Sequence, residues 1–161
     1  MRVLLLSTYE LGHQPLHLAS PAAALQGAGH QVRCLDLAAQ AWDEEAVGWA
    51  EAVAVSVPMH TAMRLAMRAA ARLRSTRPEL PLCLYGLYAG VSRELTLGRL
   101  TDFTVAGEYE PELLAWVERT GRGPAQAGSV LSRDRGTFAV PSRDLLPPLS
   151  SYAHLAMGGQ E

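Results

Sequence analysis

The chain has 161 residues, a length that suits one domain with one sizeable core. Hydrophobic residues make up 48% of it, which favours a folded chain over a disordered one. The net charge of −2 gives no reason to expect a nucleic-acid partner, and the absence of Lys excludes a P-loop or Schiff-base lysine. No signal peptide and no apolar stretch of the ~18 residues that span a bilayer are recognisable, so we expect a cytoplasmic protein without a membrane partner.

The first third of the chain alternates apolar runs with helical patterns. Residues 2–7, RVLLLS, form a continuous apolar run typical of a strand buried on both faces of a parallel sheet. The helical pattern that follows contains Pro21, so the helix is expected to begin there, with Ser20 as its N-cap. Residues 31–37 alternate like a strand near a sheet edge, and residues 43–51 predict a short, weak helix.

The same alternation continues to residue 121. Apolar runs predict strands at residues 52–58, 80–86 and 102–107. Helical patterns predict helices at residues 61–78, 92–100 and 110–121, with Ser92 as a cap of the second. Such alternation is typical of an α/β fold with right-handed crossovers. The sequence therefore predicts a flavodoxin-like, Rossmann-like three-layer sandwich over residues 1–121, with a five-stranded parallel sheet in the order 2-1-3-4-5.

Residues 122–161 differ from the rest in composition, because they are rich in Gly, Pro, Ser and Arg. They hold one possible short strand, residues 137–140, and a proline-rich segment. We expect a tail or linker that leads out of the domain. The two cysteines, Cys34 and Cys83, lie in apolar strand-like runs and are expected to be buried reduced thiols.

Ligands of open parallel sheets bind at the carboxyl ends of the strands. This rule selects five loops, at residues 8–14, 36–40, 57–61, 86–90 and 107–110. They are rich in glycine, aromatic and polar residues, as a binding surface requires. His13 and His60 are also consistent with solvated loop histidines, and Glu108 and Glu110 with the acidic first turn of a helix.

Several common kinds of site are not encoded. No nucleophile elbow surrounds Ser56, and no G-x-G-x-x-G follows the first strand. The cysteines are too few for an iron–sulfur cluster, and His13, His17 and His30 share no metal-ligand spacing. We therefore predict no catalytic residues in this chain.

Four stretches resemble the cobalamin-binding domains that are fused to radical SAM enzymes. Residues 101–117 resemble their D-x-x-V-x-G-E-x-E…L pattern, carried here by Asp102, Val105, Gly107, Glu108, Glu110 and Leu113. Residues 2–37 look like their opening strand, loop, helix and GH-x-V…D stretch, and residues 52–62 like their third-strand loop. RDLLPPLSSY, residues 143–152, resembles the D-x-L-P-x-P segment that leads into the radical SAM barrel.

The resemblance implies that cobalamin is the cofactor, with the corrin ring over the carboxyl edge of the sheet and the nucleotide tail between loops. With the strand-end rule, it predicts contacts from one set of residues. These are Tyr9, Glu10, Leu11, Gly12, His13, Gln14, Ser56, Val57, Pro58, His60, Thr61, Tyr85, Gly86, Leu87, Tyr88, Gly107, Glu108 and Tyr109.

The resemblance also implies a role in methyl transfer or related radical chemistry. The 4Fe-4S cluster and S-adenosylmethionine would belong to a radical SAM domain, because the C-x-x-x-C-x-x-C motif is absent here. The chain is thus expected to be non-catalytic alone, either as an N-terminal piece of a longer protein or as a stand-alone module. The end of the chain soon after LPPLSSYAHL favours truncation.

One loop departs from the pattern of many cobalamin-binding proteins, which carry D-x-H-x-x-G after the first strand with the His bound to cobalt. Here Glu10 and Gly12 interrupt that pattern, and His13 stands at a different spacing. We expect base-off cobalamin without a protein imidazole, with His13 as the alternative cobalt ligand. Tyr85, Leu87 and Tyr88 stand where many relatives have glycines for the nucleotide tail, so loss of cobalamin binding is also open.

Two other functions remain open at this stage. Residues 12–32 also look like the start of a two-Rossmann glycosyltransferase, although GEYEP has no counterpart there. A ligand-free flavodoxin-like interaction domain is the second alternative. A phosphotransfer domain is excluded, because Ser56-Val57-Pro58 stands where an Asp should end the third strand.

Overall fold

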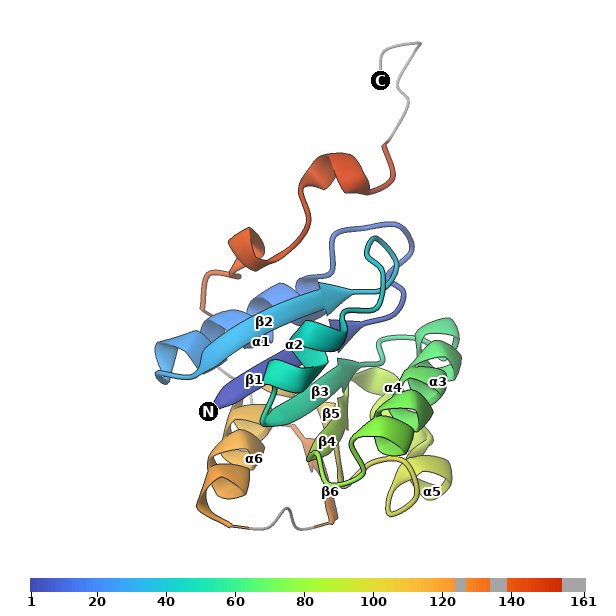
Figure 1. Ribbon diagram of the computed structural model, residues 1–161, viewed down its shortest axis with the longest axis vertical. Coiled ribbons are helices and arrows are strands. Elements are labelled where there is room, and N and C mark those ends of the chain that lie inside the picture. Colours follow the sequence, from blue (N-terminus) through green and yellow to red (C-terminus); the bar gives the residue numbers. More distant parts are fainter. Residues whose placement is uncertain (124–126, 134–138, 155–161) are drawn as a thin grey trace.

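Strand β1 lies inside a sheet of six parallel strands in the order β2-β1-β3-β4-β5-β6 (Figure 1). The computed structural model describes residues 1–123, 127–133 and 139–154. The strands are β1 (Arg2–Ser7), β2 (Gln31–Asp36), β3 (Ala52–Ser56), β4 (Leu82–Tyr85), β5 (Phe103–Gly107) and β6 (Gly128–Ser132). The predicted parallel sheet and the order of its first five strands are confirmed.

The prediction of five strands is wrong by one, because β6 pairs with β5 at the edge of the sheet. Only five residues long, β6 alternates between half-buried and exposed positions, so GSVLS has none of the continuous apolar character that marks the inner strands. Its place depends on Gly107, which has a φ of +80°. A Cβ at this position would collide with the carbonyl oxygen of Ser132, so a larger residue would displace β6.

Helices cover both faces of the sheet. They are α1 (Leu16–Gly27), α2 (Glu44–Trp49), α3 (His60–Thr76), α4 (Leu87–Val91), α5 (Arg93–Thr96) and α6 (Glu110–Arg122). Helices α1 and α6 pack on the face that buries Leu5, while α2, α3 and α4 pack on the face that buries Leu4. Because β1 has helices on both sides, both faces of its apolar run are needed in the core.

Helix α1 begins at Leu16, five residues before the predicted start. Pro21 lies inside it and lacks the N–H that would bond to the carbonyl of His17. The Tyr85 hydroxyl donates to that carbonyl instead, at 2.5 Å, so the helix continues through the proline. Ser20 is therefore not an N-cap, and its hydroxyl donates to Glu110 Oε1 at 2.7 Å.

The connection between β4 and β5 holds two short helices where the sequence predicts one. Helix α4 was not predicted, and α5 covers only the first part of the helix expected at residues 92–100. The Ser92 hydroxyl donates back to the carbonyl of Tyr88 at 2.7 Å, so it does not cap α5 as predicted. A serine hydroxyl that bonds to the turn before it cannot also cap the helix that follows.

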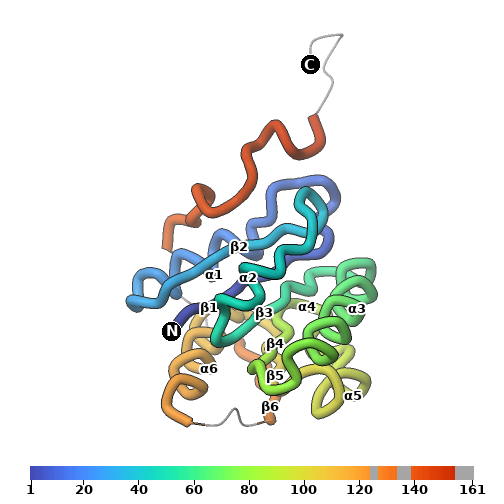
Figure 2. Tube along the Cα trace, in the orientation of Figure 1, coloured from blue at the N-terminus to red at the C-terminus, as the bar shows by residue number. Residues whose placement is uncertain are grey.

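The C-terminal segment, residues 139–154, lies along α1 and continues to the loop after β1 (Figure 2). The Ser142 N–H donates to the carbonyl of Ala19 at 2.9 Å, and Leu145 and Leu146 pack against the core on the α1 side. The segment contains two short 3-10 helices, η1 (Arg143–Leu145) and η2 (Leu149–Ser151). Of the possible strand at residues 137–140, residues 137 and 138 lie outside the described residues, and the other two are not in a strand.

Both cysteines are free thiols. Cys83 is buried as expected, and burial raises its pKa. Cys34 is only half-buried, on edge strand β2, and burial still raises its pKa to about 12. Of the helices in the described ranges, none has the length and apolar character to cross a bilayer.

Candidate functional site

All six strands end at the same edge of the sheet, so the loops that follow them lie together. We call this the carboxyl edge. Strand β2 lies on one side of β1, and strand β3 lies on the other side. The loops after β1 and β3 therefore diverge at a switch point, where open α/β sheets bind their ligands.

The loop after β1 turns sharply and exposes two side chains. Leu11 has a φ of +55° and Gly12 a φ of +77°, and the His13 N–H donates to the carbonyl of Glu10 at 2.9 Å. This left-handed conformation is unusual for a leucine, and it leaves the Leu11 side chain 60% exposed. The His13 side chain is also exposed, and within the described ranges its ring has no hydrogen bond or ion pair.

The loops after β3 and β4 support each other. The Tyr88 N–H donates to the carbonyl of Val57 at 3.0 Å, and a Cβ on Gly86, whose φ is +107°, would lie 3.3 Å from that carbonyl. This close contact requires glycine at position 86. It positions Leu87, 69% exposed, and the His60 and Tyr88 rings, 6.3 Å apart, on the same edge.

The residues predicted to contact a ligand differ in exposure. The exposed ones are Leu11, His13, His60, Thr61, Leu87 and Gly107. The half-buried ones are Tyr9, Glu10, Gly12, Gln14, Pro58, Tyr88, Glu108 and Tyr109. Ser56, Val57, Tyr85 and Gly86 are buried. These last four can support a ligand only from below the surface.

Two tyrosines fill the space between the sheet and α1, beneath the carboxyl edge. Tyr85 is fully buried, and its ring centroid lies 5.0 Å from that of Tyr109. The Tyr109 hydroxyl hydrogen-bonds to His17 Nδ1 at 2.9 Å, while the Tyr85 hydroxyl holds the His17 carbonyl. Helix α1 is thus fixed to the ends of β4 and β5 through a single residue, His17.

Glu10 extends this network toward the loop after β1. Its Oε1 lies 3.9 Å from His17 Nε2, and its Oε2 has no hydrogen-bond partner within the described chain. Burial, with a further contribution from the Asp36 carboxylate, raises the pKa of Glu10 to about 7. Burial also lowers the pKa of His17. Both shifts favour the neutral forms, so this contact is not a strong ion pair near neutral pH.

The C-terminal segment reaches the same edge from the β2 side. The Tyr152 hydroxyl donates to Asp36 Oδ2 at 3.0 Å, and the Ala153 N–H donates to the carbonyl of Gly12 at 2.9 Å. The Gln14 amide donates to the carbonyl of Pro147 at 3.0 Å and accepts from Arg143 at 2.8 Å.

Sequence reasoning left three residues of this edge out of the predicted set: His17, Asp36 and Tyr152. Asp36 ends a predicted strand, so the strand-end rule was sufficient to find it. The role of His17 was signalled only by Pro21, whose missing N–H leaves the His17 carbonyl free. Nothing in the sequence pairs Tyr152 with Asp36.

No group of three or more His, Cys, Asp or Glu side chains that could hold a metal ion occurs in the part of the chain that the structure describes. His13 lies in the loop after β1, and His60 is the first residue of α3.

Comparison with known families decides which ligand the edge suits. The sequence profile of the B12 binding domain family matches residues 2–116. The chain belongs to the B12-binding domain family. No curated protein sequence matches it. The match runs from β1 into α6 and includes the five loops selected from the sequence. It supports cobalamin as the ligand of this B12-binding domain. It does not favour the alternative of a glycosyltransferase.

Two features of the carboxyl edge of this B12-binding domain are compatible with a corrin ring. Leu11 and Leu87 offer exposed apolar contact to a flat macrocycle. Glu10 Oε2, in the loop after β1, has no hydrogen-bond partner within the described residues. The amide groups around a corrin ring are donors of the kind that this atom requires. Cobalamin carries its own equatorial ligands, which agrees with the isolated histidines.

The hydrogen bond between Tyr85 and the His17 carbonyl is testable with a double-mutant cycle. We expect Tyr85→Phe to lower the free energy of unfolding by about 1–3 kcal/mol, because it leaves a buried carbonyl without a donor. In a Pro21→Ala background the restored N–H takes that role, and the cost of Tyr85→Phe should fall by about 1 kcal/mol. Urea unfolding measures all four proteins, with Tyr9→Phe as the control. An equal cost in both backgrounds would contradict the assignment.

The raised pKa of Glu10 predicts a dependence of stability on pH. Its folded-state pKa of about 7 lies above the ordinary value of 4.5 for a glutamate, so its contribution to stability is complete below pH 4.5 and is lost as the pH rises through 7. Between these pH values the wild-type protein should lose up to about 3 kcal/mol of stability through Glu10, and Glu10→Gln should not show this loss. His17 and His30 have lowered pKa values, so they make stability rise with pH in both proteins. The difference in stability between wild type and Glu10→Gln therefore reports on Glu10.

This prediction is checked by urea unfolding at pH 5 and pH 8, with Glu108→Gln as the control on the same edge. The difference in stability between wild type and Glu10→Gln should change with pH, and by more than the difference between wild type and Glu108→Gln. Parallel pH profiles for wild type and Glu10→Gln would show that Glu10 is not the group responsible.

Proposed function

We propose that this domain binds cobalamin at its carboxyl edge and presents it to a radical SAM domain. The observation that carries the proposal is the family match over residues 2–116, which contains every loop of that edge that follows β1 to β5. The exposed apolar side chains and the unpartnered Glu10 Oε2 at this edge support it. This chain would then hold and orient the cofactor, and the partner domain would carry the reaction.

The proposed ring contacts come from two adjacent loops. Tyr9 and Leu11 would pack against one face of the corrin, and the backbone at Gly12 would approach it closely. Leu87 and Tyr88 would contact its margin from the loop after β4. We propose that the cobalt keeps no protein imidazole, because the geometry of the turn exposes His13 without any partner that would orient it.

The nucleotide tail has less room below the α1 side of this edge, because Tyr85 and Tyr109 fill that space. On the α3 side a cavity of about 360 Å³ opens beside Thr8 and Leu37. It is also lined by Gln40, Trp42, Leu65, Arg68, Ala69 and Arg72. We propose that the phosphodiester of the tail lies near this cavity, where the Arg68 guanidinium favours an anion, while Arg72 pairs with Glu44.

A radical SAM partner is supported by the segment at residues 143–152. It resembles the segment that leads into radical SAM barrels, and it lies against Gln14, Gly12 and Asp36 at the carboxyl edge. A domain joined through this segment would stand near the bound ring. When bound, cobalamin would supply a cobalt that takes up a methyl group and passes it on, and the partner domain would supply the 4Fe-4S cluster and S-adenosylmethionine.

Cobalamin binding is tested with the purified chain. After mixing with hydroxocobalamin and desalting, the protein should retain corrin absorption bands in the visible spectrum. Leu87→Glu places a charge against the proposed ring margin and should weaken binding at least about tenfold. Val140→Glu, at a side chain that is 89% exposed and distant from the edge, is the matched control.

Two outcomes of the same experiment refine or reject the proposal. His13→Ala should leave the cobalt spectrum unchanged, and a changed spectrum would identify His13 as a ligand. Loss of all corrin bands from the wild-type protein on desalting, or equal weakening by Leu87→Glu and Val140→Glu, would contradict cobalamin binding at this edge.

A further inference from the structure

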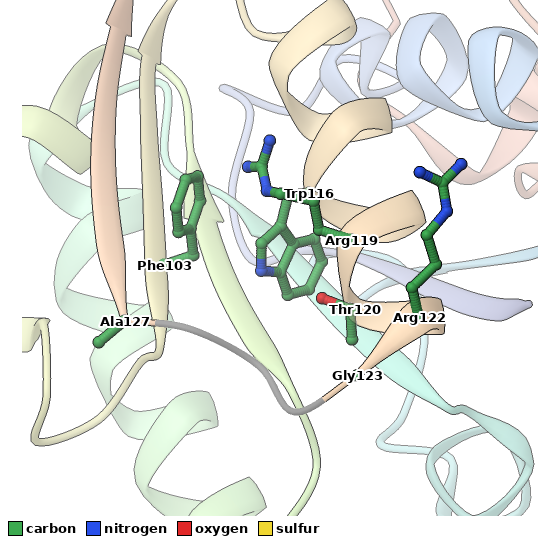
Figure 3. Close-up of a pocket in the computed structure, with 7 residues that line it drawn as sticks. All are labelled: Phe103, Trp116, Arg119, Thr120, Arg122, Gly123 and Ala127. Carbon is green, nitrogen blue, oxygen red and sulfur yellow. The ribbon is translucent and has the colours of Figure 1, made fainter.

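A second cavity lies at the opposite end of the sheet from the carboxyl edge. It has a volume of about 370 Å³ and opens between the last turns of α6 and the first residues of β5 and β6 (Figure 3). Phe103, Trp116, Arg119, Thr120, Arg122, Gly123 and Ala127 line it. Strand β5 separates it from the carboxyl edge by roughly 13 Å, given the rise per residue of a strand. The volume lies in the range of small-molecule sites.

Two aromatic rings form the walls of this cavity. Phe103 projects from the start of β5 and Trp116 from α6, and Figure 3 shows the two rings facing the same space. The position of the Phe103 ring depends on Gly128, its partner in β6, because a Cβ there would lie 2.5 Å from Phe103 Cε2. A glycine at this register position therefore keeps the ring against the sheet and the cavity open.

Trp116 and Arg119 supply hydrogen-bond donors to the cavity. Trp116 is only 2% exposed, and its Nε1–H has no hydrogen-bond partner among the described residues. Leaving a buried donor unpaired is unfavourable, and an acceptor on a ligand would remove that cost. Arg119 supplies the charge: its guanidinium lies 5.3 Å from the centroid of Phe103, and no acidic side chain pairs with it in the described ranges.

We propose that this cavity binds a small aromatic carboxylate. One carboxylate oxygen accepts from the indole N–H of Trp116, and the Arg119 guanidinium pairs with the same group. The aromatic body lies against the Phe103 and Trp116 rings, which favour flat apolar partners. A cationic ligand is excluded because both charged residues that line the cavity are arginines. Arg122 contributes less, because it contacts Glu118 at 3.8 Å and points away from the rings (Figure 3).

The indole N–H signal of Trp116 in a proton–nitrogen NMR spectrum reports directly on this site. The chain has three tryptophans, so only three such signals arise, and Trp42→Phe and Trp49→Phe assign the other two. Titration with 2-naphthoate should shift the Trp116 signal saturably. The uncharged 2-naphthamide should bind at least about tenfold more weakly, because it lacks the charge that Arg119 recognises.

Variants distinguish specific binding in this cavity from nonspecific binding. Arg119→Gln should weaken naphthoate binding at least about tenfold, and Arg93→Gln, which removes one exposed arginine from α5, should change it less than about twofold. The dispersion of the NMR spectrum verifies that each variant is folded. Absence of a saturable shift of the Trp116 signal up to about 10 mM naphthoate, equal binding of the amide, or equal losses in the two variants would overturn the proposal. The result is independent of cobalamin binding at the carboxyl edge.

Discussion

The parallel pairing of β1 with β2 on one side and β3 on the other is the constraint on which the rest of this molecule depends. Because β1 is hydrogen-bonded on both sides and covered on both faces, every residue from Val3 to Leu6 must be apolar. The same pairing makes the chain diverge at the end of β1. The loop that carries Leu11, Gly12 and His13 therefore stands at the point of the sheet where ligands bind.

The space beneath the end of β1 is filled on one face of the sheet and partly open on the other. On the α1 side, Pro21 removes one helix hydrogen bond, and Tyr85 replaces it while filling the interior with its ring. On the α3 side a cavity remains beside the loop after β2. The position of one proline and one tyrosine thus affects how a cofactor with a bulky tail can approach the edge. The proposed contacts to the corrin ring and to the nucleotide tail would then depend on different parts of the chain.

Most of the fold could be predicted from local patterns, since apolar runs identified the four inner strands and an alternating pattern identified one edge strand, β2. Strand β6 could not, because GSVLS carries no pattern of its own and joins the sheet only through the space that Gly107 leaves. The start of α1 was misplaced because Pro21 is a strong local signal that a distant hydroxyl overrides. The strand-end rule identified the loops of the candidate site. It could not tell that Tyr85 faces inward or that Tyr152 reaches Asp36, because both depend on packing between distant segments.

Hydrogen–deuterium exchange with and without hydroxocobalamin tests most directly whether cobalamin binds over the carboxyl edge. Exchange should become slower in the loops at residues 8–14, 57–61 and 86–90, and the amides of α6 at residues 116–122 should be unchanged. Protection confined to residues 116–122 and the start of β5, or no protection anywhere at saturating hydroxocobalamin, would contradict it.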